Sequence, residues 1–151
     1  MAANGRKYGF SGSITGASSK TIAVVSNGGT VRPYLMDIII SSNATPADNS
    51  SEWQVLSCTA AGTSTSVTPR QLDEADPAAI SLAGKNNSVE PTYTGVSVLD
   101  IAHNQRATFR WIAAPGEEII ASATSGHGYG IQCQGVGGSG VAEICSVVFG
   151  E

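Results

Sequence analysis

Tyr34–Ser41, with the sequence YLMDIIIS, and Val141–Phe149, with the sequence VAEICSVVF, are the stretches that decide the fold. Both are rich in the branched side chains that favour extended backbone. Each is also apolar at neighbouring positions, so both faces of the strand it forms carry apolar side chains. A lone small sandwich would leave one of those faces in water, and we therefore expect neighbouring subunits to cover it.

Shorter strand patterns fill the rest of the chain. In Arg106–Ala113 the apolar Phe109 and Trp111 alternate with Arg110, as in a half-buried strand. Glycines and prolines punctuate these segments, and no window shows a helical period. The pattern predicts an all-β, single-domain antiparallel β-sandwich that is jelly-roll-like. The other expected strands are Tyr8–Ile14, Thr21–Ser26, Val31–Ser41, Glu52–Ala60, Val89–Thr94, Val96–His103, Glu118–Ala123, Tyr129–Gln134 and Val141–Phe149.

Turn signals indicate how some of these strands are joined. Asn27-Gly28-Gly29 follows Thr21–Ser26, and because Asn and Gly tolerate positive φ we expect a hairpin into Val31–Ser41. The Asn104-Gln105 pair likewise predicts a tight turn before Arg106.

Composition divides the chain into an arm, a sandwich and a connector. Residues 1–7 are polar and are expected to form a flexible N-terminal arm, with the sandwich domain over 8–151. Residues 61–88 form the longest irregular piece, and long loops in compact domains are often functional. Within it, Asp76–Gly84 carries an N-cap, an early proline and a closing glycine, which are signals of a short helix; a connector without a helix is the alternative.

Charge and composition exclude several classes of function. The net charge is −4, and the eight Lys and Arg residues are dispersed, which gives no footprint for a nucleic acid. No apolar run is long enough to span a membrane, and the first ten residues lack a secretory core, so we expect a chain made in the cytoplasm. Cys58, Cys133 and Cys145 form an odd set without CxxC spacing and are expected to be buried thiols.

The chemistry-bearing residues do not form an enzyme or metal motif. His103 and His127 lack ligand spacing and are expected to be solvated or capping residues. Glu117 and Glu118 are adjacent on a strand pattern and point to opposite faces. We therefore expect no enzyme, no metal and no cofactor. The acidic group that could supply calcium ligands, but that we expect to be surface acidity, is Asp73, Glu74 and Asp76.

Aromatic side chains leave a sugar-binding role open. Trp53, Tyr34 and Tyr93 could stack on sugars, or pack in the core. For Trp111 the alternation favours the core, whereas Tyr129, flanked by glycines, is expected to be the most exposed aromatic residue.

Several blocks of the sequence resemble a family of small structural proteins from tailed bacteriophages. That family has a TAAGTGTxVTPRPLDPxDPA-like connector, then VEPTYT, LNQRATFRWVAAPG and an acidic end. Gln71 and Glu74 stand where the connector pattern has prolines. The corresponding blocks here are Thr59–Ala79, Val89–Thr94, Asn104–Gly116 and Val148–Glu151.

The resemblance implies a capsid decoration, or cement, protein. Such a protein is often a β-sandwich trimer on the outer shell where capsomers meet, with the major capsid protein as its partner. It would be assembled in the host cytoplasm and located on the virion surface, without binding nucleic acid or membrane.

Two segments are candidates for the contact surface because of their position in loops. The first is the N-terminal arm through Arg6, Lys7 and Tyr8. The second is the connector, where a projecting loop combines an arginine with an aliphatic anchor. The alternative is that both are solvated loops. The connector residues are Arg70, Gln71, Leu72 and Asp73.

Two other functions remain open on the sequence. A receptor- or carbohydrate-binding head on a tail or fibre would also be a trimeric sandwich, but it should expose an aromatic or carboxylate cluster. A sandwich enzyme acting on glycans would need two converging carboxylates.

Overall fold

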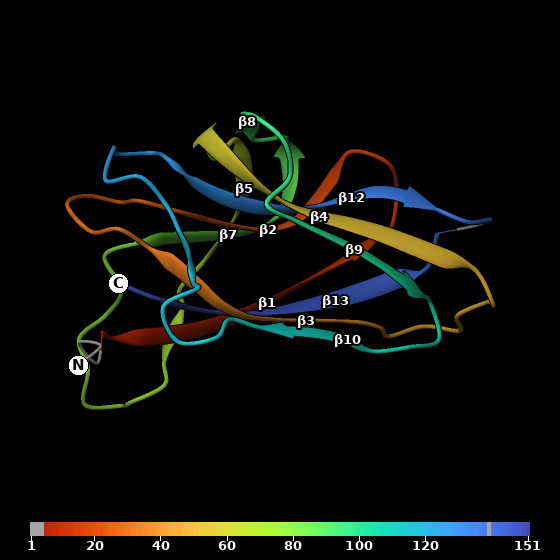
Figure 1. Cartoon of the computed structure of the whole chain (residues 1–151), viewed down its shortest axis with the longest axis horizontal. Coiled ribbons are helices and arrows are strands. Elements are labelled where there is room, and N and C mark those ends of the chain that lie inside the picture. Colours follow the sequence, from red (N-terminus) through yellow and green to blue (C-terminus); the bar gives the residue numbers. More distant parts are fainter. Residues whose placement is uncertain (1–4, 139) are drawn as a thin grey trace.

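The computed structural model describes residues 5–138 and 140–151, which form two antiparallel sheets packed face to face (Figure 1). No helix forms among these residues, and none of them therefore belongs to a helix that could span a membrane. The predicted all-β, antiparallel sandwich is confirmed.

Each sheet forms one layer. The strands of the lower layer in Figure 1, sheet A, are β1 (Lys7–Thr15), β3 (Tyr34–Ser42), β6 (Arg70–Gln71), β10 (Phe109–Ile112), β11 (Ile119–Ile120) and β13 (Ala142–Gly150). The strands of the upper layer, sheet B, are β2 (Lys20–Ser26), β4 (Ser50–Ala60), β5 (Thr63–Val67), β7 (Leu82–Val89), β8 (Thr92–Tyr93), β9 (Leu99–Asn104) and β12 (Gly128–Val136).

The strand order is that of a jelly roll. Sheet A contains the order β1-β13-β3-β10, and in sheet B β2, β12 and β4 follow one another, with β9 on the far side of β4. Among these principal strands the chain changes sheet at every step except between β4 and β9. The first and last strands are therefore neighbours, and they pair along their full length from Lys7 with Gly150 to Thr15 with Ala142.

The expected hairpin at Asn27 is wrong, because β2 and β3 lie in different sheets. Asn27 is a buried crossover residue: its Nδ2 donates to the Ala123 carbonyl at 2.7 Å, and its Oδ1 accepts the Gly29 amide at 2.8 Å. The Asn104-Gln105 turn similarly carries the chain from β9 in sheet B to β10 in sheet A. Turn residues in a sequence predict where the chain changes direction, but they do not predict which strand the next strand will pair with.

Large aromatic side chains fill the space between the sheets. Trp53 and Tyr129 extend from sheet B, and Tyr8 and Phe149 from sheet A, and all four are buried. Tyr8 stacks on Phe149 with ring centroids 5.6 Å apart. Phe109 and Trp111 pack partly buried against this core while Arg110 is exposed, which confirms the predicted alternation.

β1 of sheet A packs closely against sheet B beside Gly12. A Cβ atom there would lie 2.5 Å from the Ile22 carbonyl oxygen of β2 and 3.0 Å from the Lys85 Cβ of β7. Both neighbours are fixed parts of sheet B, so a larger side chain would force the sheets apart. Glycine at this position therefore allows the edge strand of sheet A to close against sheet B.

The expected irregular connector over 61–88 is largely wrong, because β5, β6 and most of β7 lie within it. The irregular part is residues 72–81, which we call the β6–β7 loop. The short helix over Asp76–Gly84 does not form: the loop is turn and coil until β7 begins at Leu82.

The expected arm over 1–7 falls partly outside the described residues, since 1–4 are not among them. Its last residue, Lys7, is already the first residue of β1 and pairs with Gly150. The arm prediction is therefore wrong for Lys7.

We predict that Gly12→Val lowers the free energy of unfolding by about 1–3 kcal/mol, because the added methyl groups meet the backbone of β2. Urea denaturation monitored by tryptophan fluorescence measures the loss. Gly135→Ala is the control, because a Cβ there meets only the Glu52 carboxylate, at 4.0 Å, and equal losses for both variants would contradict the close approach.

Candidate interaction surface

The two segments expected to make contacts lie side by side at one edge of sheet A. β6 pairs with the start of β1, with Gln71 opposite Tyr8 and Arg70 opposite Gly9. The Leu72 amide extends this pairing by donating to the Lys7 carbonyl at 2.9 Å. Residues that are more than sixty positions apart in sequence thus form one surface.

Within the first segment, only Arg6 and Lys7 reach solvent. Arg6 is exposed and Lys7 is half-buried. Tyr8 is fully buried against Phe149, and its hydroxyl donates to the Pro77 carbonyl at 3.1 Å. The expectation that Tyr8 contacts a partner is therefore corrected: its ring belongs to the core, because β1 alternates and Tyr8 is on the inward phase.

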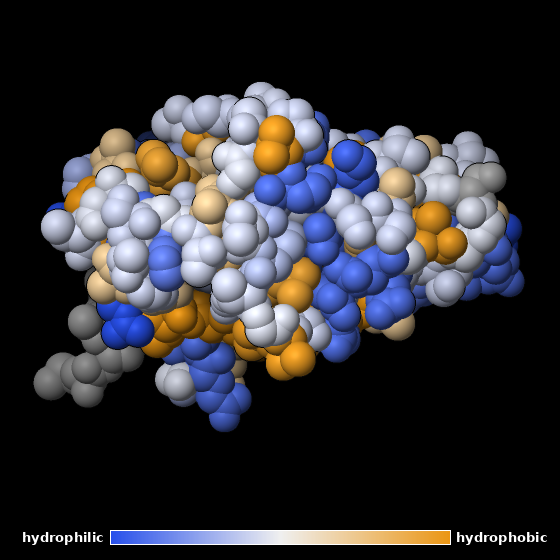
Figure 2. All heavy atoms as spheres, turned by 90° about the horizontal axis from the view of Figure 1, so that it is seen from above, coloured by the Kyte–Doolittle hydropathy of each residue, from blue (hydrophilic) through white to orange (hydrophobic). Residues whose placement is uncertain are grey.

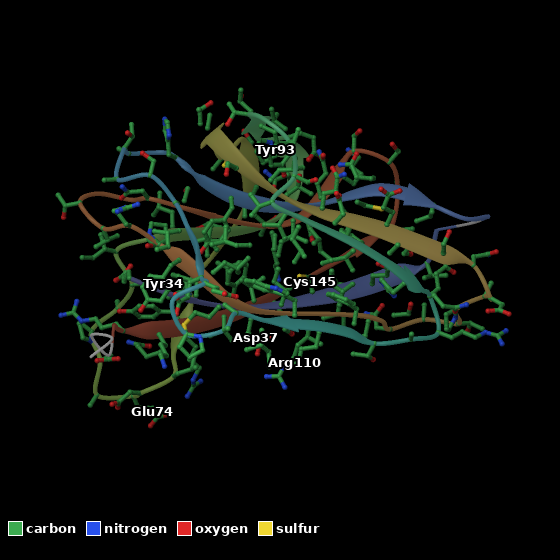
Figure 3. The ribbon with its side chains drawn as sticks, viewed as in Figure 1. Tyr34, Asp37, Glu74, Tyr93, Arg110 and Cys145 are labelled. Atoms are coloured by element: carbon green, nitrogen blue, oxygen red, sulfur yellow. The ribbon has the colours of Figure 1, made fainter. Side chains whose placement is uncertain are left out.

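The second segment begins a projecting loop. Arg70 is exposed and forms an exposed ion pair with Glu74 at 3.2 Å, which contributes little to stability. Leu72 is 56% exposed, although it is a large apolar residue. Asp73 closes a turn, its carbonyl accepting the Asp76 amide at 3.0 Å. Figure 3 shows Glu74 at the far end of this loop, below the sandwich.

The outer face of sheet A, which we call the A face, is low in charge. One row of paired residues across it is Ser11, Ser146, Ile39 and Arg110, and the next is Gly9, Val148, Asp37 and Ile112. Leu72 lies over the second row, with its Cδ1 3.5 Å from the position of a Cβ on Gly9.

A single ion pair interrupts these two rows. The Arg110 guanidinium donates to both carboxylate oxygens of Asp37, with Nη2 2.6 Å from Oδ2 and Nε 3.1 Å from Oδ1. This bond raises the pKa of Arg110. Figure 3 places both residues on the lower side of the sandwich. Because the charges neutralise each other, the rows present apolar and small polar groups to a partner.

The outer face of sheet B is partly covered by the chain itself. Residues 90–98, which we call the strap, pair in part with the edge of β4, and the Tyr93 ring packs over β12 where a Cβ on Gly130 would stand. The Thr21 amide donates to Glu90 Oε2 at 3.0 Å, and the Thr21 hydroxyl lies 2.7 Å from the Tyr93 hydroxyl. Burial raises the pKa of Tyr93.

What remains of the sheet B side carries both polar and apolar groups, among them the exposed Leu82 and Val89 of β7. Figure 2, which looks onto this side, shows a mostly pale surface broken by smaller blue and orange areas. A shallow hollow there is lined by both polar and apolar residues, among them Ser64, Ser66, Val24, Leu82 and Ala83. The A face therefore remains as the face that the strap does not cover.

The residues considered for catalysis do not converge. Over residues 5–138 and 140–151, no group of three or more His, Cys, Asp or Glu side chains could hold a metal. His103 bonds the carbonyl of its neighbour Asn104 through Nδ1 at 2.9 Å. Asp73 and Asp76 belong to the turn of the β6–β7 loop.

Two glutamates that bond across the fold were missed on the sequence. Glu143 is fully buried, and its Oε1 accepts the Ser51 hydroxyl of the opposite sheet at 2.5 Å. Glu143 stands two residues before the buried Cys145 on the same strand, so strand alternation predicts that its side chain points inward. Glu151 accepts hydrogen bonds from the β6–β7 loop; no local signal marks that contact, because its partners are about seventy residues away.

The expected exposure of Tyr129 is wrong, since the ring is 2% exposed. The flanking Gly128 and Gly130 are paired strand residues of β12, between β2 and β4, and do not mark a loop. Large apolar side chains that are exposed among the described residues are all aliphatic. Among the aromatic residues considered for sugar stacking, Tyr34, Tyr93 and Trp111 are half-buried, and Trp53 is buried.

Comparison with models of protein families, with curated proteins and with solved structures finds no match for the chain.

The three thiols are buried, as predicted, and burial raises the pKa of Cys58 and Cys133 to about 11. Unfolded thiols ionise near 9.0, so between about pH 9 and pH 11 the unfolded chain binds fewer protons than the folded chain. We predict that the free energy of unfolding falls as the pH rises through this window. Urea denaturation across the window measures the fall, which Cys58→Ala should reduce; an unchanged slope in that variant would contradict the burial of this thiol.

Proposed function

We propose that the chain is a virion structural protein that binds the outer surface of a tailed-phage head where capsomers meet and stabilises the shell. Its partners are the major capsid protein and further copies of itself, in a trimer assembled in the host cytoplasm. The sequence resemblance supports the trimeric state and the phage head, and the geometry of sheet A and the β6–β7 loop supports the choice of contact surface.

The observation that carries the proposal is the position of the β6–β7 loop beside the A face. Leu72 projects from the loop over Gly9, and the low-charge rows of the A face continue from there toward Ile112. An apolar, neutral surface with a projecting aliphatic side chain is typical of a protein contact. A stable contact buries about 800 Å² on each partner.

The mechanism is adhesion without turnover. Each subunit would contribute a limited contact, and linking three subunits makes attachment much stronger than one contact alone. By bridging neighbouring capsomers, the bound protein resists their separation under the outward pressure of packaged DNA.

The alternative, a receptor- or carbohydrate-binding head on a tail or fibre, has less support. Such a head needs an exposed aromatic or carboxylate cluster, and the exposed large apolar side chains of the described residues include no aromatic one. Glycan-array binding by the purified protein would favour this alternative over the shell-binding proposal.

The first test removes the projecting side chains. We predict that Arg70→Ala combined with Leu72→Ala abolishes retention on purified shells and leaves the fold intact, because both side chains are exposed. Co-sedimentation with shells measures retention. The control combines Arg106→Ala with Leu82→Ala, which removes an exposed arginine and an exposed leucine away from the A face; unchanged retention of the first pair would dismiss the loop as a contact.

The second test places a charge on the A face. Ser11 is exposed in the first row, so Ser11→Arg is expected to prevent close approach of a partner and to lower shell retention by at least about tenfold, which corresponds to about 1.4 kcal/mol. Ser66→Arg makes the same change on the exposed edge strand β5 of sheet B and is expected to bind normally. Equal binding by both variants would remove the A face from the proposal.

A further inference from the structure

The β6–β7 loop lacks the helix that its sequence favours because the groups a helix would pair are engaged elsewhere. A helix starting after Asp76 would join the Ile80 amide to the Asp76 carbonyl and the Ser81 amide to the Pro77 carbonyl. Instead, the Asp76 carbonyl accepts Gln71 Nε2 at 3.2 Å, and the Pro77 carbonyl accepts the Tyr8 hydroxyl at 3.1 Å.

Both amides donate to one side chain, that of Glu151. The Ile80 amide lies 3.0 Å from Glu151 Oε1, and the Ser81 amide lies 2.9 Å from Oε2. The Ser81 hydroxyl adds a third donor, 2.8 Å from the same Oε2. Successive amides that converge on a carboxylate form an anion-binding nest, and hydrogen bonds to a charged acceptor are the strong ones.

Glu151 is itself fixed to the sandwich. Its backbone amide donates to the Arg6 carbonyl at 3.1 Å, directly beyond the pairing of Lys7 with Gly150. The carboxylate also acts on the neighbouring tyrosine: burial and the Glu151 charge raise the pKa of Tyr8. The side chain therefore joins the end of the paired β1 and β13 strands to the returning arm of the loop.

These contacts hold the loop at both ends. β6 and the Leu72 amide fix its start against β1, while Tyr8 and Glu151 fix its end. Residues 73–76 between them are exposed, apart from the half-buried Asp76, and their turn is closed by the Asp73 carbonyl. A projecting loop fixed in this way loses little conformational freedom when it binds a partner.

We propose that Glu151 is a positioning residue that preorganises the β6–β7 loop for docking, without itself touching the partner. This inference rests on the proposed function. Loss of the carboxylate should release Ile80 and Ser81, increase the freedom of the loop and weaken docking through the entropy of ordering.

Hydrogen exchange in the free protein tests, without any shell, whether Glu151 holds the Ile80 and Ser81 amides. In Glu151→Ala the amides of Ile80 and Ser81 are expected to exchange at least about tenfold faster than in the unchanged protein, while the amides of β12 and β13 keep their rates. Glu151→Gln retains one acceptor oxygen and should give an intermediate rate. Glu117→Gln, which removes an exposed carboxylate from the turn before β11, is the control and should change neither.

Shell binding tests the positioning role. Glu151→Ala is expected to bind purified shells about tenfold more weakly than the unchanged protein, with partial rescue in Glu151→Gln. Unchanged exchange at Ile80 and Ser81 in Glu151→Ala would show that the Glu151 carboxylate does not hold the loop. Faster exchange with full shell binding would overturn the positioning role alone. If the unchanged protein does not bind shells, the proposed function and the docking role fail together, whereas the exchange result still decides whether Glu151 holds the loop.

Discussion

The packing of the two sheets against each other is the constraint on which the rest of the structure depends. Trp53 and Tyr129 from sheet B meet Tyr8 and Phe149 from sheet A, and burial of such rings contributes most of the apolar area of a small core. The sheets can meet along β1 because Gly12 leaves room for the Ile22 carbonyl. Because the inner faces of the sheets pack against each other, the outward-pointing apolar residues of β3 and β13, such as Ile39 and Val148, lie on the A face.

That constraint also explains why the two outer faces differ. The strap covers part of sheet B, with Tyr93 over Gly130 and Glu90 bonded to Thr21. The two paired rows of sheet A carry one ion pair, between Arg110 and Asp37. If the proposed function holds, a partner that docks on these rows of sheet A would desolvate little unpaired charge.

The β6–β7 loop shows how tertiary bonds override a local preference. Its capping residues favour a helix, but a helix of about two turns is worth little alone, because nucleation is costly. Hydrogen bonds from the Ile80 and Ser81 amides to Glu151, together with the bond from the Tyr8 hydroxyl to the Pro77 carbonyl, satisfy the same backbone groups in a different conformation. The loop conformation thus depends on residues about seventy positions away.

The sequence by itself determined the fold class, most strand positions and the burial of the three thiols, because these depend on side-chain alternation within a few residues. It also singled out the two segments flanking the β1–β6 pairing. Only the tertiary structure decided that Asn27 begins a crossover and not a hairpin, that Tyr8 and Tyr129 face inward, and that Glu151 fixes the β6–β7 loop. Each of these depends on contacts between distant segments, and a local pattern contains no information about which strand or carboxylate will be the partner.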